Sequence, residues 1–114
     1  TDARLVPLLF QAAAYVDDNI TDSTITVEGM AAHLGMSRVQ LYKKLLSITG
    51  VTPSEFMRQI RMRRGEQLLR ESQYTVSEVA YKVGFNVPRY FTKYFKEMYG
   101  VTPSQYKNQS ENKE

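Results

Sequence analysis

Two segments rich in basic and aromatic side chains resemble each other, and each directly follows a glycine, Gly35 or Gly84. Residues 36–46 are echoed by residues 85–95, and each segment runs into an identical Gly-Val-Thr-Pro-Ser at 50–54 and 100–104. The second residue of each segment, Ser37 or Asn86, is suited to cap a helix, and Lys or Arg follows within the segment. Such a helix suits recognition of nucleic acid, because its N-terminal residues can enter the major groove. The repeat predicts two helix-turn-helix units in tandem and indicates duplex DNA as the target.

The charge of the chain is unevenly distributed. The net charge is only +3, but residues 1–37 carry one Arg against five acidic residues, whereas residues 38–70 carry eight Lys or Arg against two. A basic middle behind an acidic start indicates a surface that faces a polyanion. A solvated basic helix face explains the same counts equally well.

The composition excludes several other classes of protein. The chain has no cysteine, so it has no disulfide or thiolate metal site, which fits a reducing compartment and a cytoplasmic location. No apolar run approaches the ~20 residues that cross a bilayer, and no secretory signal opens the chain. The first residue is Thr1, which indicates a fragment of a longer protein.

Catalysis and metal binding are not expected. The hydroxyl groups stand at helix caps, and no nucleophile–base pair or phosphate-binding loop is present, so the chain is not predicted to be an enzyme. His33 is the only histidine and has no cluster of carboxylates around it. Metal ligation needs several such groups, so we expect neither a metal nor another cofactor.

Apolar periodicity predicts an all-α chain of seven helices, because no alternating strand pattern appears. The predicted organisation has an N-terminal helix and lead-in (1–25), a first helix-turn-helix unit (26–52), a linker helix (53–71), a second unit (72–107) and a flexible tail (108–114). The first helix should run from Leu5 to Ile20. Its predicted inward stripe comprises Leu5, Leu9, Ala12, Ala13, Val16 and Ile20.

Local capping signals define most of the helix boundaries. Caps are expected at Thr26 and Asn86, and capping boxes at Ser37–Gln40, Thr52–Glu55 and Thr75–Glu78. Residues 102–105 should open a last short helix. Gly35 and Gly84 permit the positive φ of the two turns, and Ala31 and Ala80, four residues earlier, allow close helix crossing. Gly65 inside the linker helix costs roughly 1 kcal/mol relative to Ala, which predicts close packing of a neighbouring helix there.

Several side chains have more than one interpretation. The aromatic residues of the last repeat could stack on single-stranded bases, but their helical spacing favours a core; they are Tyr90, Phe91, Tyr94, Phe95 and Tyr99. Tyr42 either faces DNA or packs inward. The arginines of the linker helix are either a solvated face or contacts to DNA or a second subunit; they are Arg58, Arg61, Arg63 and Arg64.

The chain resembles the DNA-binding domain of AraC/XylS-type transcription regulators over residues 27–107. The resemblance rests on Ala80–Phe85, Tyr90-Phe91, Phe95-Lys96 and Gly100–Tyr106. The first unit, with Leu34–Arg38 and Leu41-Tyr42, is similar to versions at the C-terminus of hybrid two-component regulators, in which a sensor and a phosphorelay lie upstream.

The resemblance implies two recognition helices that enter successive major-groove segments about one helical turn, ~34 Å, apart. It implies base contacts from Val39, Tyr42 and Lys43 in the first unit and from Pro88, Arg89, Thr92 and Lys93 in the second. Arg and Lys suit guanine, and Val39 suits a thymine methyl group. Phosphate contacts are expected from Ser37, Arg38, Lys44, Asn86 and Lys96.

The chain departs from the family pattern in two places. The reading positions contain no Trp or Gln, and Pro88 beside Val87 offers few polar groups, so the second unit should read sequence more loosely. Gly65 replaces the expected Ala, which leaves the linker helix less rigid.

Two functions remain open on the sequence alone. The first is sequence-specific binding of double-stranded promoter DNA by the output domain of a regulator that recruits RNA polymerase, with a dimer formed through missing upstream domains. The alternative is a helical module that binds protein or single-stranded nucleic acid. The two differ in strand preference and in the salt dependence of binding.

Overall fold

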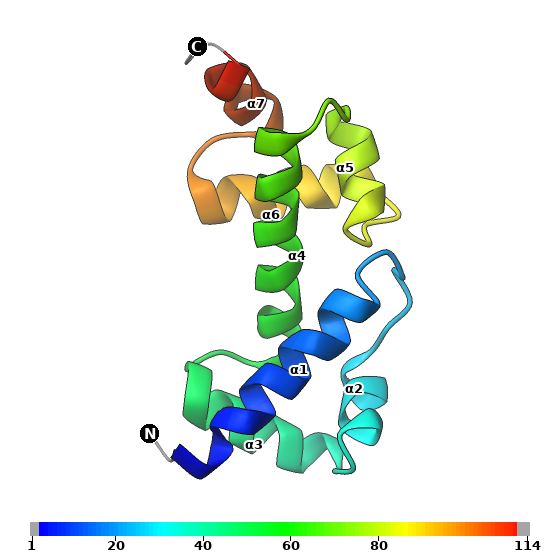
Figure 1. Cartoon of the computed structure of the whole chain (residues 1–114), viewed down its shortest axis with the longest axis vertical. Helices are drawn as coiled ribbons and strands as arrows, with labels where there is room; N and C mark the ends of the chain where they lie inside the picture. The colour runs from blue at the N-terminus through cyan, green and yellow to red at the C-terminus, as the bar shows by residue number, and fades with distance from the viewer. Residues whose placement is uncertain (1–2, 112–114) are drawn as a thin grey trace. The chain divides into compact units, whose positions relative to one another are not determined.

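The computed structural model describes residues 3–111, and its regular structure is helical. Within this range it has a short 3-10 turn, seven α-helices and no strand (Figure 1), which confirms the predicted all-α class. The elements are η1 (Ala3–Leu5), α1 (Val6–Asp18), α2 (Val27–His33), α3 (Arg38–Thr49), α4 (Pro53–Glu71), α5 (Val76–Lys82), α6 (Pro88–Tyr99) and α7 (Pro103–Glu111).

The chain divides into two compact units, and α4 contributes to both. The first unit holds residues up to Asn19 together with Thr24–Ile60. The second holds Ile20–Ser23 and the chain from Arg61 onward. Each unit therefore has its own core and its own pair of helices joined by a tight turn.

The core of the first unit forms where α1 packs against α3. Leu8, Ala12 and Val16 of α1 are buried at intervals of four residues, and Leu41 and Leu45 of α3 are fully buried. The buried side of α1 is therefore rotated slightly about the helix axis relative to the predicted inward stripe. Of its members, Leu5, Leu9 and Ala13 are only half-buried, and Ile20 packs against the core of the second unit. Apolar residues occur nearly all around α1, so hydrophobicity alone could not select the buried side.

The two helix-turn-helix corners repeat the same backbone geometry. Gly35 and Gly84 adopt φ of +73° and +90°. The amide of Met36 donates to the carbonyl of Ala31 at 3.0 Å, and the amide of Phe85 donates to that of Ala80 at 2.9 Å. Both alanines are buried, which confirms the predicted close crossing. The left-handed glycine lets the chain reverse and satisfies the last carbonyls of the first helix.

The start of α4 only partly matches the prediction. The hydroxyl of Thr52 accepts a hydrogen bond from the amide of Glu55 at 3.2 Å, as a cap should. The Glu55 carboxylate pairs instead with Arg58 on the next turn. The predicted reciprocal capping box is therefore wrong in its second half, because a nearby guanidinium competes for the carboxylate.

The core of the second unit is built from α4, α5 and α6. Its buried members are Met62, Leu69, Val79, Ala80, Val83, Phe91 and Phe95. A Cβ atom at Gly65 would lie 2.6 Å from Cε1 and 2.8 Å from Cζ of Phe91. This confirms the close approach predicted at Gly65, because α4 has room there for a hydrogen only.

The last helix is longer than predicted. Thr102 and Gln105 form a reciprocal capping box, with hydrogen bonds of 2.9 and 3.2 Å. From there α7 continues to Glu111, so residues 108–111 of the predicted flexible tail are helical, and residues 112–114 lie outside the described range. No glycine or proline interrupts the segment after Pro103, so the capped helix can propagate. The Tyr106 hydroxyl also donates to the Glu66 carboxylate of α4.

Candidate nucleic-acid interface

The first candidate recognition helix is α3, and its start is rigidly capped. The Ser37 hydroxyl accepts from the amide of Gln40 at 3.1 Å, while the Gln40 side chain accepts from the amide of Ser37 at 2.9 Å. The predicted capping box is confirmed. It holds the first turn of α3 in one conformation, so the side chains that follow project from a defined backbone.

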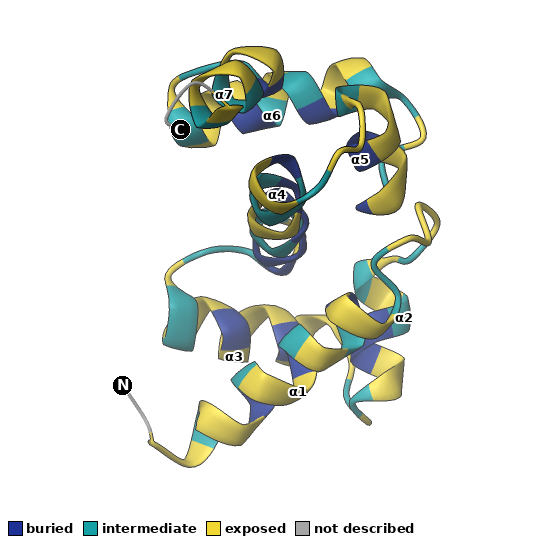
Figure 2. Ribbon diagram, turned by 45° about the horizontal axis from the view of Figure 1, so that its top comes forward, coloured by how far each residue is buried: buried dark blue, intermediate teal, exposed yellow. Residues whose placement is uncertain are grey.

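One side of α3 is buried and the other faces solvent (Figure 2). Leu41 and Leu45 face the core, whereas Val39 is 61% exposed and Tyr42 is 45% exposed. The alternative that Tyr42 packs inward is therefore wrong. Val39 and Tyr42 together form an apolar strip on the solvent side of the helix.

Basic side chains border this apolar strip. Lys43 and Lys44 are exposed on α3. Arg38 is also exposed and pairs with Glu28 of α2 at 3.2 Å. An exposed pair of this kind contributes at most about 1 kcal/mol, so Arg38 can exchange Glu28 for a phosphate at little cost. All six positions predicted on the first unit thus lie at its surface: Val39, Tyr42 and Lys43 for bases, and Ser37, Arg38 and Lys44 for phosphates.

The second candidate recognition helix, α6, starts differently from α3. Asn86 was predicted to cap it, but the cap position is Val87, which makes no side-chain hydrogen bond, and Pro88 opens the helix. Asn86 lies one residue too early because the ring of Pro88 holds Val87 in an extended conformation. The prediction of an Asn86 cap is wrong, and the amide groups at the start of α6 have no side-chain cap.

The predicted reading positions of α6 differ in how far they reach solvent. Arg89 and Lys93 are exposed, whereas Pro88 and Thr92 are half-buried. The guanidinium carbon of Arg89 lies 5.3 Å from the centre of the Tyr90 ring. This cation–π contact keeps the charge beside the helix rather than free in solvent. Asn86 and Lys96, predicted at phosphates, are exposed.

The aromatic residues of α6 form a core rather than a stacking platform. Phe91 and Phe95 are fully buried, with ring centres 5.7 Å apart. Tyr94 and Tyr99 are half-buried. Tyr90 is the exception, because 45% of it is exposed. Its assignment to the core is wrong, and it adds an exposed ring beside Arg89 that the apolar pattern alone could not separate from its neighbours.

Arg61 supports the second unit from within, a role that its residue type and spacing do not predict. It is 7% exposed, and its guanidinium donates to the carbonyls of Val83 at 2.6 Å, Ile20 at 2.7 Å and Asp22 at 3.0 Å. Burial lowers the pKa of Arg61, and the Asp22 carboxylate opposes that shift. The interpretation of Arg61 as part of a solvated face is wrong. It fixes the carbonyl before Gly84 and so positions the turn that leads into α6.

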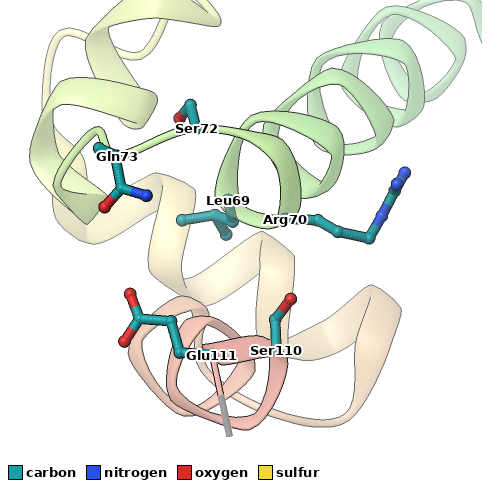
Figure 3. A pocket seen from close by; sticks show the side chains of 6 residues that line it. All are labelled: Leu69, Arg70, Ser72, Gln73, Ser110 and Glu111. Carbon is teal, nitrogen blue, oxygen red and sulfur yellow. The ribbon is translucent and has the colours of Figure 1, made fainter. Parts of the chain in front are cut away.

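Two hollows are lined by residues that belong to neither α3 nor α6. One is lined by the end of α4 and the end of α7 (Figure 3). There Arg70 extends away from Glu111 and is engaged by Glu66 at 2.9 Å. The other lies in the first unit, where the His33 ring stands 5.0 Å from that of Tyr15. Among residues 3–111 no three His, Cys, Asp or Glu side chains form a group that could hold a metal ion.

The fold and these exposed helices define a tandem helix-turn-helix protein. A family model described as "Helix-turn-helix domain" matches residues 30–109. The chain belongs to this family, and its relatives are DNA-binding transcription regulators of AraC/XylS type. Over the part that the structure describes, no helix is long and apolar enough to span a membrane.

Individual relatives agree with this membership. The chain is 40% identical over 101 residues to histidine kinase P4 of Formosa agariphila, an alignment that covers 89% of this chain and 7% of the kinase. The chain therefore spans a small part of that relative. The C-terminal domain of AraT, a response regulator from Geobacillus stearothermophilus, matches with a TM-score of 0.84 at 30% identity and covers 94% of this chain and 88% of that chain. The DNA-binding domain of AdpA, solved in complex with a target DNA, matches with a TM-score of 0.82 at 29% identity and covers 89% of this chain and 90% of that chain.

Proposed function

We propose that the chain binds specific duplex DNA sites as the output domain of a transcription regulator, with α3 and α6 in successive major-groove segments. The observation that carries this proposal is the matched surface of the two helices. Each follows a glycine turn of the same geometry, buries one side and presents basic side chains on the other. The AdpA domain of similar fold in complex with its target DNA supports the same mode of binding.

In the first unit the bases are read by Val39, Tyr42 and Lys43. Lys43 is suited to the acceptors of guanine, and the exposed Val39 to a thymine methyl group. Ser37 and Lys44 contact phosphates. The Ser37 hydroxyl accepts from the Gln40 amide, and its own hydrogen remains able to donate to a phosphate oxygen. Arg38 joins them by leaving its surface pair with Glu28.

In the second unit Arg89 and Lys93 supply the polar base contacts, and Pro88 and Thr92 lie at the edge of the reading surface. Asn86 and Lys96 contact phosphates. The start of α6 has no side-chain cap, and uncapped amides at a helix start favour a phosphate. This unit therefore depends more on backbone contacts than the first, which makes its sequence preference broader.

The relatives support a proposal for the role of the whole protein. Histidine kinase P4 and the response regulator AraT both carry a domain similar to this chain. We propose that upstream sensor or receiver domains control the DNA binding of this chain in the cytoplasm, that a bound regulator recruits RNA polymerase, and that this domain catalyses no reaction itself.

Measuring affinity for duplexes tests the proposal most directly. The preferred sites are first selected from a random pool of duplexes. The affinity of the chain for these duplexes is then measured at several salt concentrations, and its affinity for each separated single strand is measured in the same way. A duplex reader that neutralises Z phosphates loses affinity with a log–log slope near −0.9Z. For variants that remove one positive charge from α3 or α6, such as Lys43→Ala, the charge-matched control is Lys82→Ala, because Lys82 is exposed on α5. Absence of duplex binding at low salt, or a preference for single strands, contradicts the proposal.

A further inference from the structure

The loop that follows α1 belongs in part to the second unit. Residues Ile20–Ser23 are part of that unit, whereas α1 and Asn19 are part of the first. The side-chain amide of Asn19 donates to the carbonyl of Tyr15 at 2.8 Å and so holds Asn19 to the last turn of α1. The side chain of Ile20 packs against the core of the second unit. The Asn19–Ile20 peptide bond therefore connects the end of α1 directly to a segment that the second unit holds.

One buried guanidinium joins this segment to the turn before α6. Nη1 of Arg61 donates to the carbonyl of Ile20 at 2.7 Å and to the carbonyl of Val83 at 2.6 Å. Nη2 of Arg61 donates to the carbonyl of Asp22 at 3.0 Å. We call these three hydrogen bonds the Arg61 brace. Because one nitrogen serves both Ile20 and Val83, a displacement of either carbonyl moves the donor of the other.

The two helix-turn-helix turns differ in this contact. A Cβ atom at Gly84 would overlap Nη1 of Arg61 and would lie 2.5 Å from the carbonyl oxygen of Ile20. A Cβ atom at Gly35 would meet no atom within 4 Å. Since the first turn forms the same backbone hydrogen bonds without such a contact, helix-turn-helix geometry alone does not explain the Arg61 brace.

The start of α6 also lacks the local support that α3 has. Ser37 and Gln40 close a capping box at the start of α3, whereas Val87, the cap residue of α6, makes no side-chain hydrogen bond. Local contacts therefore fix the first turn of α3. The first turn of α6 depends instead on the turn that precedes it, and the Arg61 brace holds that turn.

We propose that residues 20–22 position α6 for DNA through the Arg61 brace, so that the loop after α1 sets how precisely the second unit reads its half of the site. This inference rests on the proposed function, because it treats α6 as a recognition helix. Reading side chains must be held within about 0.5 Å of their productive geometry, so a loosened turn lowers sequence discrimination while the fold persists. Since Ile20 directly follows the end of α1, a pull on α1 by the proposed upstream domains reaches α6 by this route and leaves the capped α3 in place.

Amide hydrogen exchange of the full chain tests the Arg61 brace without DNA. Ile20→Ala removes the side chain that anchors the segment. The matched control is Leu68→Ala, because Leu68 is also half-buried against the same core but takes no part in the brace. The amide of Phe85 closes the second turn, and the amide of Met36 closes the first. Phe85 should exchange on the order of tenfold faster in Ile20→Ala than in Leu68→Ala, as expected when one hydrogen bond from a charged donor is weakened, and Met36 should not change.

A second variant examines the guanidinium itself. Arg61→Lys keeps the positive charge but loses the planar fork of donors. Its effect on the exchange of Phe85 should not add to that of Ile20→Ala in the double variant, because both changes disrupt one network. Far-UV circular dichroism verifies that each variant is folded, and Ile20→Val replaces an Ile20→Ala chain that melts below the assay temperature. Equal exchange of Phe85 in Ile20→Ala and Leu68→Ala, or effects that add, would overturn the proposal.

Discrimination between DNA sites measures the positioning of α6. The preferred duplex is compared with duplexes changed at the base pair that Arg89 reads or at the base pair that Lys43 reads. Ile20→Ala should lose about three- to tenfold of the discrimination at the Arg89 base pair, a part of what one good base contact supplies, and none at the Lys43 base pair. Leu68→Ala should lose neither.

Equal losses at the two base pairs would indicate general destabilisation and would overturn the positioning role, as would unchanged discrimination at the Arg89 base pair. A parent chain that binds no duplex would instead refute the proposed function. The exchange of Phe85 would then still decide whether residues 20–22 hold the turn before α6, because that measurement contains no DNA.

Discussion

Replacing Gly65 by Ala sets two opposite effects against each other inside α4. Ala is favoured over Gly in a helix interior by about 1 kcal/mol. The new methyl group, however, would stand 2.6 Å from Cε1 of the fully buried Phe91, whereas carbon atoms normally approach to about 3.5–4.0 Å. The Phe91 ring must therefore move by about 1 Å within a packed core, which costs roughly 2–3 kcal/mol. We expect Gly65→Ala to lower the free energy of unfolding by about 1–2 kcal/mol.

Urea denaturation followed by far-UV circular dichroism measures this loss as a lower midpoint at unchanged slope. The matched control is Gly29→Ala in α2, where a Cβ would meet only the side-chain oxygens of Thr26 and Tyr15, each at 3.3 Å. Its stability should stay within about 0.5 kcal/mol of the parent. Phe91→Leu should relieve part of the penalty in the double variant, as a coupling between contacting residues. A Gly65→Ala variant more stable than the parent would refute the close packing of Phe91 on Gly65.

Three further predictions follow from the cores and the exposed helices. Arg61→Met should lower the free energy of unfolding by about 3 kcal/mol, because buried carbonyls lose a charged donor; a melting temperature equal to that of the parent would contradict its role at the turn. Arg70 first, and then the Tyr106 hydroxyl, hold the pKa of Glu66 below its usual 4.5, against the opposing effect of burial. The stabilisation by Glu66 is therefore present above pH 4.5 and is lost as the pH falls through the lowered pKa. In unfolding experiments at several pH values, Glu66→Gln should be less stable than the parent at neutral pH, with a difference that shrinks in acid; a difference independent of pH would speak against this linkage. Lys43→Ala and Arg89→Ala should each weaken binding to the preferred duplex by about 1–3 kcal/mol and relax one base position, and equal losses on all sequences would make them phosphate contacts.

Much of the helix-turn-helix geometry was predictable because its signals are local. The capping boxes at Ser37 and Thr75 join residues three apart, and both are present. The turns need a positive φ at Gly35 and Gly84, and both glycines adopt it. Interactions within four residues depend little on the rest of the chain, so residue type and spacing suffice to predict them.

The side chains whose role depends on distant partners were harder to predict. In the sequence, Arg61 does not differ from the exposed arginines near it. In the folded chain, residues far away in sequence supply the three carbonyls that accept its hydrogen bonds. Tyr42 and Tyr90 resemble core aromatics in their spacing, and only the packing of their units leaves them at the surface. Asn86 had the right type for a cap but the wrong place beside Pro88.

The amino-acid sequence by itself determined that this protein is helical, where most helices begin and end, and that two similar units follow one another with basic second helices. Capping residues, glycines and apolar periodicity specify these properties, because their interactions form between residues within one or two helical turns of each other. Tertiary structure alone decided which side of α1 is buried, that Arg61 is an internal brace, and which aromatic rings reach solvent. Each of those outcomes depends on which groups from remote segments meet in the folded chain, and single-residue types carry no information on that meeting.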